Sequence, residues 1–339
     1  MRIGKLDNDT LNALILSKFA HTRSEVLCSP QVGVDCAAVD MGGRIAVLST
    51  DPITAADKHL GALTVHVSCN DAAAAGAEPI GLLTTLLVPP SATEDDIARV
   101  ADELSAAAKA ANVEIIGGHT EVTDAVTRMI TSAAVIAKAG ERGILTTGGM
   151  KEGDSIVLSK WACLEGTAII ANDFADRLDG ISQAELEEAR GYMSYVSVVR
   201  EGLYAYANGA HAMHDVTEGG VFGAAWEMSE ASGVGIEIDA AKVPLKPATQ
   251  KICAALGLDP FRLLSSGAML IACPDGETLA NGLMQMGINA AVIGRAGGKG
   301  VRTFAFNKNG ANGSGKGVRT ANGDMIAPPG ADELYKLYK

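Results

Sequence analysis

The chain lacks the basic charge and the long apolar run that would place it with nucleic-acid-binding or membrane proteins. It has 28 Lys and Arg against 40 Asp and Glu, a formal net charge of −12, so no general affinity for nucleic acid or anionic lipid is expected. Its most apolar stretch, residues 60–88, is interrupted by His66, Asn70, Asp71 and Glu78 and cannot span a bilayer. An acidic protein that binds a phosphate ligand must recruit cations, and a divalent metal is the obvious candidate.

The chain also lacks cysteine pairs with metal-ligand or redox spacing. There is no C-x-x-C pair, and no His stands near a cysteine at zinc-finger spacing. The six cysteines are Cys28, Cys36, Cys69, Cys163, Cys253 and Cys273. They are expected to be small buried apolar residues in a reducing cytosol. Asp7 and Asp9 interrupt the region where a signal peptide would need its apolar core, so a cytoplasmic location is predicted.

The length and the glycine distribution predict two α/β domains and a tail. A chain of 339 residues, 47% of them apolar, exceeds what one core usually serves. The Gly-rich stretch 140–153 is the expected boundary, giving domains over residues 1–145 and 146–306. Residues 307–339 form a Gly- and Asn-rich tail, expected to be a hairpin or mobile. The tail repeats Gly-Lys-Gly-Val-Arg-Thr, at 298–303 and 315–320, but neither copy has the order of a phosphate-binding loop.

Alternating apolar patterns predict the elements of both halves. In the first half we expect helices over 8–19, 58–77 and 94–111, a hairpin joining strands 36–39 and 45–49, and strands over 79–88, 113–116 and 128–137. Thr93 is the expected cap of the third helix, and acidic residues follow it in the first turn. In the second half we expect strands over 155–159 and 212–214, near 236 and 269, and over 291–293, and a helix over 220–232. Strands that alternate with helices indicate layered α/β domains.

Three carboxylates in the first half are candidate metal ligands. Asp71 stands beside Asn70 in a helix of small apolar residues, where a half-buried carboxylate is costly unless a cation or hydrogen bonds compensate it. Asp35 and Asp51 stand at the ends of predicted strands. Three carboxylates on separate elements are typical of a hard-cation site that leaves positions for phosphate oxygens. Each segment can also be interpreted as purely structural. Asp51 before Pro52, for example, fits an ordinary turn.

The second half offers the segment 211–220, where a strand ends on a polar loop that opens a helix through two glycines. The N-terminus of that helix is expected to be free to receive an anion. Alternatively, Asp215 or Thr217 caps the helix. His211 and His214 flank Met213 and need not face the same way on a strand, so no zinc site is expected.

These segments resemble a known superfamily, which includes aminoimidazole ribonucleotide synthetase, the hydrogenase-maturation carbamoyl dehydratase HypE, thiamine monophosphate kinase and selenophosphate synthetase. The resemblance covers nearly the whole chain. It rests on Gly4-Lys5-Leu6, residues 33–39, Ser49-Thr50-Asp51, Asn70-Asp71-Ala72 with Gly76-Ala77, Gly117-Gly118-x-Thr120, residues 215–220 and Leu264-Ser265-Ser266-Gly267. The dehydratase branch looks most similar.

The resemblance implies a homodimer whose N-terminal domains build a shared β-barrel and which binds ATP through Mg²⁺. ATP then phosphorylates an amide-like or other small-molecule oxygen, and a thiol-bearing or maturation partner protein is a further implied partner. The implied metal ligands are Asp35, Asp51 and Asp71. Nucleotide contacts are assigned to Lys5, Asn70, Gly117, Gly118, Thr120 and Gly219, and catalytic roles to Asp215, Glu218 and His119.

Three departures from the family pattern leave alternatives open. No cysteine follows Cys273, although the dehydratase carries its substrate on a C-terminal cysteine. His119 stands where relatives often place Asp, with Glu121 nearby, and Val34 stands where a second acidic residue is common. A small-molecule kinase similar to thiamine monophosphate kinase is therefore one alternative. A nucleotide-binding regulator without turnover is another.

Overall fold

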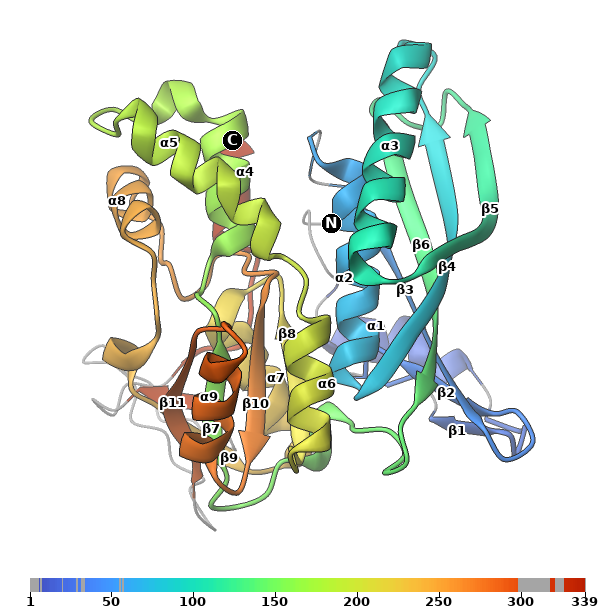
Figure 1. The fold of residues 1–339 in the computed structure, drawn as a ribbon, viewed down its shortest axis with the longest axis vertical. Helices are drawn as coiled ribbons and strands as arrows, with labels where there is room; N and C mark the ends of the chain where they lie inside the picture. Colours follow the sequence, from blue (N-terminus) through green and yellow to red (C-terminus); the bar gives the residue numbers. More distant parts are fainter. Residues whose placement is uncertain are drawn as a thin grey trace.

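The computed structural model of the protein describes residues 6, 8–19, 21–28, 30–31, 34–54, 56, 58–297, 318–320 and 326–338. Each half of the chain forms one six-stranded sheet with its own helices, and the two halves pack side by side (Figure 1). The predicted α/β class is confirmed. Within the described residues, no helix is both long enough and apolar enough to cross a membrane.

The first sheet is mostly antiparallel. Its strand order is β1-β2-β3-β6-β4-β5, and only β4 and β5 pair in parallel. The strands are β1 (Val26–Cys28), β2 (Ala37–Asp40), β3 (Ile45–Ile53), β4 (Ala77–Val88), β5 (Glu114–Val122) and β6 (Ile130–Ala139). The accompanying helices are α1 (Asn8–Leu14), the 3-10 turn η1 (Leu16–Lys18), α2 (Leu60–Ala74) and α3 (Glu94–Ala111).

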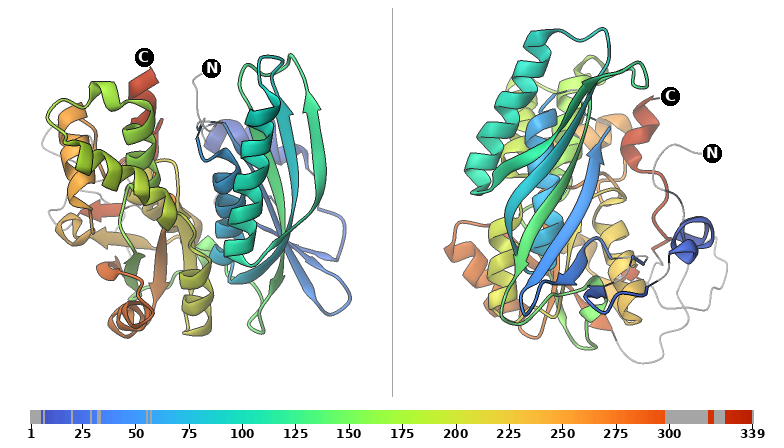
Figure 2. Two further views of the ribbon diagram at one scale, coloured as in Figure 1. Left: turned by 45° about the horizontal axis from the view of Figure 1, so that its top comes forward. Right: turned by 90° about the vertical axis from the view of Figure 1, so that its right-hand side faces the viewer.

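Helices cover one face of this sheet only. Alternate residues of β6 are buried, and Val135 packs with Val65 and Cys69 of α2. Figures 1 and 2 show α2 and α3 on the same side of the sheet, and no helix on the other side. The predicted start of α3 is confirmed, because Thr93 accepts from the Asp96 backbone and the Asp96 carboxylate accepts from the Thr93 backbone in a capping box.

The second sheet is buried on both faces. Its order is β12-β9-β11-β7-β10-β8. The strands are β7 (Ser155–Ser159), β8 (Ala212–Val216), β9 (Gly235–Ile238), β10 (Ala268–Cys273), β11 (Ala290–Gly297) and β12 (Val318–Thr320). On β7, Ile156 and Leu158 face one core with Met228 of α7, while Val157 faces another with Leu279 of α9.

The helices of the second half are α4 (Leu164–Asp173), α5 (Gln183–Arg190), α6 (Val199–Ala207), α7 (Gly220–Ser232), α8 (Pro247–Leu256) and α9 (Gly276–Gln285). Short 3-10 turns are η2 (Thr147–Gly149), η3 (Ala175–Arg177), η4 (Gly191–Tyr195), η5 (Ala240–Lys242) and η6 (Glu333–Tyr338). The helix predicted over 220–232 has these same bounds.

One expectation about the tail is wrong for its last part. Ile326, Leu334 and Leu337 are buried in the larger core of the second half, so residues 326–338 are packed rather than mobile. This segment packs beside the end of α4. The Arg177 guanidinium donates to the Leu337 carbonyl at 2.7 Å, and the rings of Phe174 and Tyr338 meet edge to face.

Candidate functional site

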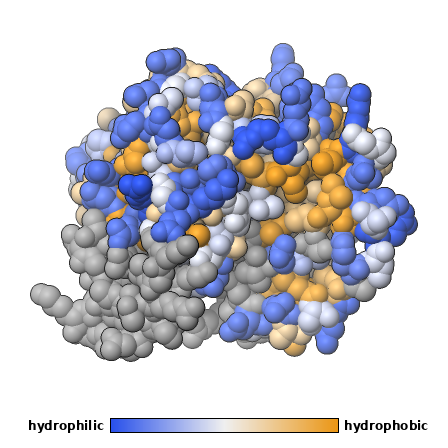
Figure 3. All heavy atoms as spheres, turned by 90° about the horizontal axis from the view of Figure 1, so that it is seen from below, coloured by the Kyte–Doolittle hydropathy of each residue, from blue (hydrophilic) through white to orange (hydrophobic). Residues whose placement is uncertain are grey.

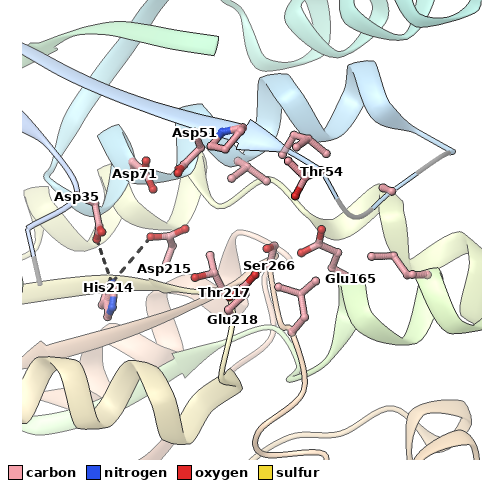
Figure 4. A pocket seen from close by; sticks show the side chains of 16 residues that line it. Asp35, Asp51, Thr54, Asp71, Glu165, His214, Asp215, Thr217, Glu218 and Ser266 are labelled. Atoms are coloured by element: carbon pink, nitrogen blue, oxygen red, sulfur yellow. Dashed lines mark ion pairs between the residues drawn. The ribbon is translucent and has the colours of Figure 1, made fainter. Parts of the chain in front are cut away.

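A pocket lies between the two halves and takes acidic side chains from both (Figure 4). Its polar lining comes from Asp35, Asp51, Thr54 and Asp71 of the first half and from Glu165, His214, Asp215, Thr217, Glu218 and Ser266 of the second. No Lys or Arg is among the described residues that line it. The three carboxylates predicted as metal ligands therefore share one pocket, and Asp215 and Glu218 reach it from the other side.

Asp71 is the most constrained of these carboxylates. It sits in the last turn of α2 with 5% of its surface exposed, and the Ser49 hydroxyl donates to its Oδ2 at 2.5 Å. Burial, followed by the charges of Asp215, Asp51 and Asp35, raises its pKa well above the ordinary carboxyl range. Carboxylates crowded in this way repel one another, and a divalent cation relieves that repulsion. The donor set, all oxygen around Asp71, suits Mg²⁺.

His214 belongs to the same group of side chains, and the sequence analysis missed it. It is 94% buried in side-chain terms, its Nε2 lies 2.7 Å from Glu227 Oε2, and its Nδ1 lies 3.5 Å from Asp35 Oδ2. Candidate ligand atoms of Asp35, His214 and Asp215 all lie within 4.8 Å of one another. Burial lowers the pKa of His214, but the Glu227 hydrogen bond and the charges of Asp35, Glu227 and Asp215 outweigh it and raise the pKa to about 9. The imidazolium thus supplies a positive charge inside an acidic pocket.

The side chains of His211 and His214 lie in different places, as the strand pattern allows. His211 precedes β8 and contacts Asp154 at 3.0 Å, away from the pocket. His214 lies within β8 and faces Asp35 across the boundary between the halves. The useful signal was the adjacency of His214 to Asp215, since two polar residues in a row are unusual in a strand that is buried throughout.

Glu165 is a second functional candidate that the sequence analysis missed. It stands in the first turn of α4, 6% exposed, and its Oε2 is buried without a hydrogen bond. Burial raises its pKa to about 7; hydrogen bonding to Ser266 opposes this, and the charges of Asp332 and Glu218 add to it. Its apolar neighbours in the sequence, including Leu164, gave no indication that a carboxyl group at this position lines a pocket.

The loop before α7 is arranged differently from either expectation. Gly219, with φ of +85°, is the residue that precedes the helix, and neither Asp215 nor Thr217 caps it. The Gly219 N–H donates to Asp332 Oδ2 at 2.8 Å, so a carboxylate of the chain itself occupies the position foreseen for an anionic ligand. The assignment of Gly219 to the nucleotide stays a prediction. Glu218 accepts a hydrogen bond of 2.6 Å from the Tyr335 hydroxyl and lines the pocket.

The segment 117–120 lies on an edge strand of the first sheet, away from the strand that carries Asp51. Gly117, Gly118, His119 and Thr120 belong to the edge strand β5, which β6 and β4 separate from β3 and its Asp51. At the usual strand spacing this is roughly 14 Å across the sheet. None of the four lines the pocket of its own chain, and their expected roles at the nucleotide stay predictions. A Cβ at Gly118 would meet the Thr84 carbonyl at 1.9 Å, so close strand packing accounts for this glycine.

Asn70 has a structural role at the boundary between the two halves. Its amide is fully buried, donates to the Val196 carbonyl at 2.9 Å and accepts from the Val198 N–H at 2.8 Å. The amide nitrogen and oxygen of Asn70 thus both join α2 to the second half, and its expected contact with nucleotide stays a prediction. Lys5 and Gly33 lie outside the described residues.

Comparison with known proteins gives one family and one fold. Residues 33–139 match the N-terminal domain and residues 151–305 the C-terminal domain of AIR synthase related proteins. A hydrogenase expression/formation protein of Methanocaldococcus jannaschii is 30% identical over 271 residues, which cover 77% of this chain and 79% of that protein. ThiL complexed with AMPPCP and TMP has a TM-score of 0.73 at 19% identity, covering 98% of both chains. HypE in a HypE–HypF complex has a TM-score of 0.69 at 21% identity, covering 86% of this chain and 93% of that one.

Proposed function

The chain belongs to the AIR synthase related protein family, and from that premise we propose that it is an ATP-dependent enzyme that activates an oxygen or nitrogen of a small acceptor. The observation that carries the proposal is Asp71, a buried carboxylate crowded by Asp35, Asp51 and Asp215. The fold is also that of ThiL, which was crystallised with AMPPCP. Nucleotide binding is thereby supported for the fold.

Asp35, Asp51 and Asp71 would hold Mg²⁺ in this pocket. When bound, the ion neutralises part of the charge of the nucleotide phosphates. Asp215 and Glu218 approach the same space from the second half and face the reacting group. His214 is held by Glu227, and its Nδ1 lies 3.5 Å from Asp35 Oδ2, so its proposed role is to position Asp35.

We further propose that two copies pair through the bare face of the first sheet and close it into a shared barrel. All nine residues of β5 are exposed, and Ile80, Leu83, Ile115 and Ile116 on β4 and β5 are exposed apolar residues. Figure 3 shows apolar side chains gathered on the half of the molecule that holds this sheet, at the right of the view. A patch of this kind marks an interface. Gly117, Gly118, His119 and Thr120 would then serve the pocket of the other copy.

The six cysteines of this sequence are poorly placed to carry the acceptor. All six cysteines are buried, at 8% exposure or less. Burial also raises the pKa of Cys36, Cys69 and Cys163, so none of these is a ready thiolate carrier. A carbamoyl dehydration like that of HypE would therefore act on a group carried by a maturation partner, as the HypE–HypF pairing suggests. The same burial favours the second candidate, a kinase for a free small molecule.

Replacing Asp71 with Asn tests the proposal. We expect ADP release from Mg–ATP to fall at least about 100-fold while the fold is retained, since one carboxylate ligand and its charge are lost. Asp124→Asn, an exposed turn residue of the same half, is the matched control and should keep full turnover. Calorimetry with Mg–ATP separates the regulator alternative, for which the wild type would bind nucleotide without releasing ADP. Undiminished turnover in Asp71→Asn would refute the metal assignment.

A further inference from the structure

The pocket has two ends of different character. Figure 4 shows Asp35, Asp51, Asp71 and His214 toward one end and Glu165 with Ser266 toward the other. Ile169, one turn after Glu165 on α4, and Leu264, two residues before Ser266, also line the pocket. Since the nucleotide phosphates belong with the carboxylates that hold the cation, this second end is left for the acceptor.

Glu165 is a costly residue to keep at this end for structural reasons alone. One of its carboxyl oxygens is buried without a hydrogen bond, and a buried polar atom left unsatisfied destabilises the fold, more so if it is charged. Ser266 lines the same pocket, and hydrogen bonding to it helps to hold the carboxyl in the pocket wall. Glu165 is neither adjacent in sequence to the predicted metal ligands nor ion-paired with a described cation. A buried, oriented carboxyl with a spare oxygen suits proton transfer.

We propose that Glu165 is the catalytic base that takes the proton from the acceptor, and that the acceptor carries an O–H or N–H proton and no negative charge. This rests on the proposed function, that the pocket transfers the γ-phosphoryl group of ATP. The acceptor oxygen or nitrogen forms the new bond to the γ-phosphorus as its proton passes to Glu165. The bond from that phosphorus to the β,γ-bridging oxygen breaks, and ADP leaves with the electron pair. Glu165 then returns its proton to solvent when the product departs.

The charge of the acceptor follows from what surrounds it. Glu218 lines the pocket beside Glu165, and Asp332 lies behind them close enough to raise the pKa of Glu165. No described Lys or Arg lines the pocket to balance them, and the imidazole of His214 lies at the other end of the pocket, beside Asp35. A phosphorylated acceptor would place further negative charge against these carboxyl groups in a partly desolvated space, which is unfavourable. Amides, alcohols and amines meet no such repulsion.

The pH dependence of Glu165 is the feature to measure first. With a pKa of about 7, the carboxyl is half protonated near neutrality, so wild-type turnover should fall about tenfold per pH unit below 7. Glu165→Gln should release ADP at least about 100-fold more slowly, and its pH profile should lack the fall in rate below pH 7. Its Kd for Mg–ATP should stay within about threefold of wild type. Glu165→Asp should recover part of the rate. Glu277→Gln, also an exchange in the first turn of a helix, is the exposed control.

Thermal unfolding separates a catalytic from a structural role. The folded pKa of Glu165 lies above the unfolded value near 4.3, so its contribution to stability is lost as pH rises toward and through 7. Glu165→Gln does not titrate and should therefore have a higher Tm than wild type at pH 8 and a similar Tm near pH 4.5. A variant that loses both turnover and Tm at pH 8 would overturn the proposal in favour of a structural role.

The acceptor class is tested with defined probes. Acetamide and ethanolamine should accelerate ADP release above the rate in water, whereas methyl phosphate should not. Acceleration by methyl phosphate alone would overturn the assignment of the acceptor class. Turnover within threefold of wild type in Glu165→Gln would overturn the role of the base while leaving the proposed function intact. Failure of the wild type to bind Mg–ATP would instead refute the proposed function itself.

Discussion

The two six-stranded sheets differ in how completely the chain covers them. In the second half, β8 and β10 are buried at every position, because helices pack on both faces. In the first half one face of the sheet is bare, and eleven of the fourteen large apolar residues exposed among the described residues belong to residues 6–122. The second half is thus complete as a packing unit, while the first presents a surface that needs a partner.

The pocket lies between these two different halves and is lined by side chains of both. The first half supplies the carboxylates Asp35, Asp51 and Asp71, and the second supplies His214 and Glu165. The segment 117–120 of the less covered half lines no pocket in its own chain, and the proposed dimer would bring it to the pocket of the second copy. A comparison of equal substitutions in the two halves therefore tests the architecture and the proposed dimer together.

The largest effect is expected from Ile116→Asp, which places a charge on the bare face. Ile116 on β5 is 49% exposed, so the monomer should fold, whereas a carboxylate buried at an interface costs roughly 2 to 4 kcal/mol. That corresponds to a Kd for dimerisation raised roughly 30- to 1,000-fold. The measurement is light scattering across a dilution series, with circular dichroism as the check on folding.

Met284→Asp is the matched control in the other half. Met284 is 48% exposed on α9, close to the value for Ile116, but it lies on a half that has no bare sheet face. Its dimerisation should equal that of wild type. If the two variants weaken association equally, the contrast between the halves is wrong and the dimer uses another surface.

A loss of stability is expected from breaking the contact between the halves at Asn70. Asn70→Ala leaves the buried Val196 carbonyl and Val198 N–H without their partner, at about 1 to 3 kcal/mol for each group, or about 2 to 6 kcal/mol in total. Urea unfolding should show this loss. It should also broaden the transition, because the halves become less tightly coupled.

Asn172→Ala is the control for this exchange. Its side chain donates only to the Ala168 carbonyl within α4, so its loss should cost less than about 1 kcal/mol. Equal losses for the two asparagines would mean that Asn70 contributes nothing specific to the contact between the halves.

Local patterns predicted the elements better than they predicted the site. The cap at Thr93, the hairpin between β2 and β3 and the bounds of α7 depend on neighbouring residues, and each is confirmed. The convergence of Asp35, Asp51 and Asp71 was also foreseeable, from costly acidic residues at the ends of elements and from family order. Contacts between distant segments were not foreseeable. The Gly219 N–H meets Asp332 across 113 residues, and no spacing rule anticipates that an acidic side chain of the tail fills a helix N-terminus.

The same limit explains the residues that were missed or misplaced. Whether a glutamate beside Leu164 faces solvent or a pocket depends on how α4 packs on the second sheet, which periodicity does not give. The placement of 117–120 on an edge strand depends on the strand order, which places β5 three positions from β3. Asn70 was recognised as unusual for its burial, but the partner that satisfies it belongs to the other half of the chain.

The smallest effect is expected where the final segment meets the loop before α7. Tyr335→Phe removes one hydrogen bond of 2.6 Å to Glu218, while Leu334 and Leu337 keep the segment packed. The loss should be about 1 kcal/mol in unfolding free energy, and turnover should change by no more than about fivefold, the rate factor that such an energy allows. Tyr195→Phe, at a ring that is 40% exposed, should be neutral in both measurements. A much larger loss of turnover in Tyr335→Phe would mean that the second half relies on this segment to place Glu218. The important difference between the halves would then lie at the pocket and not in how completely their sheets are covered.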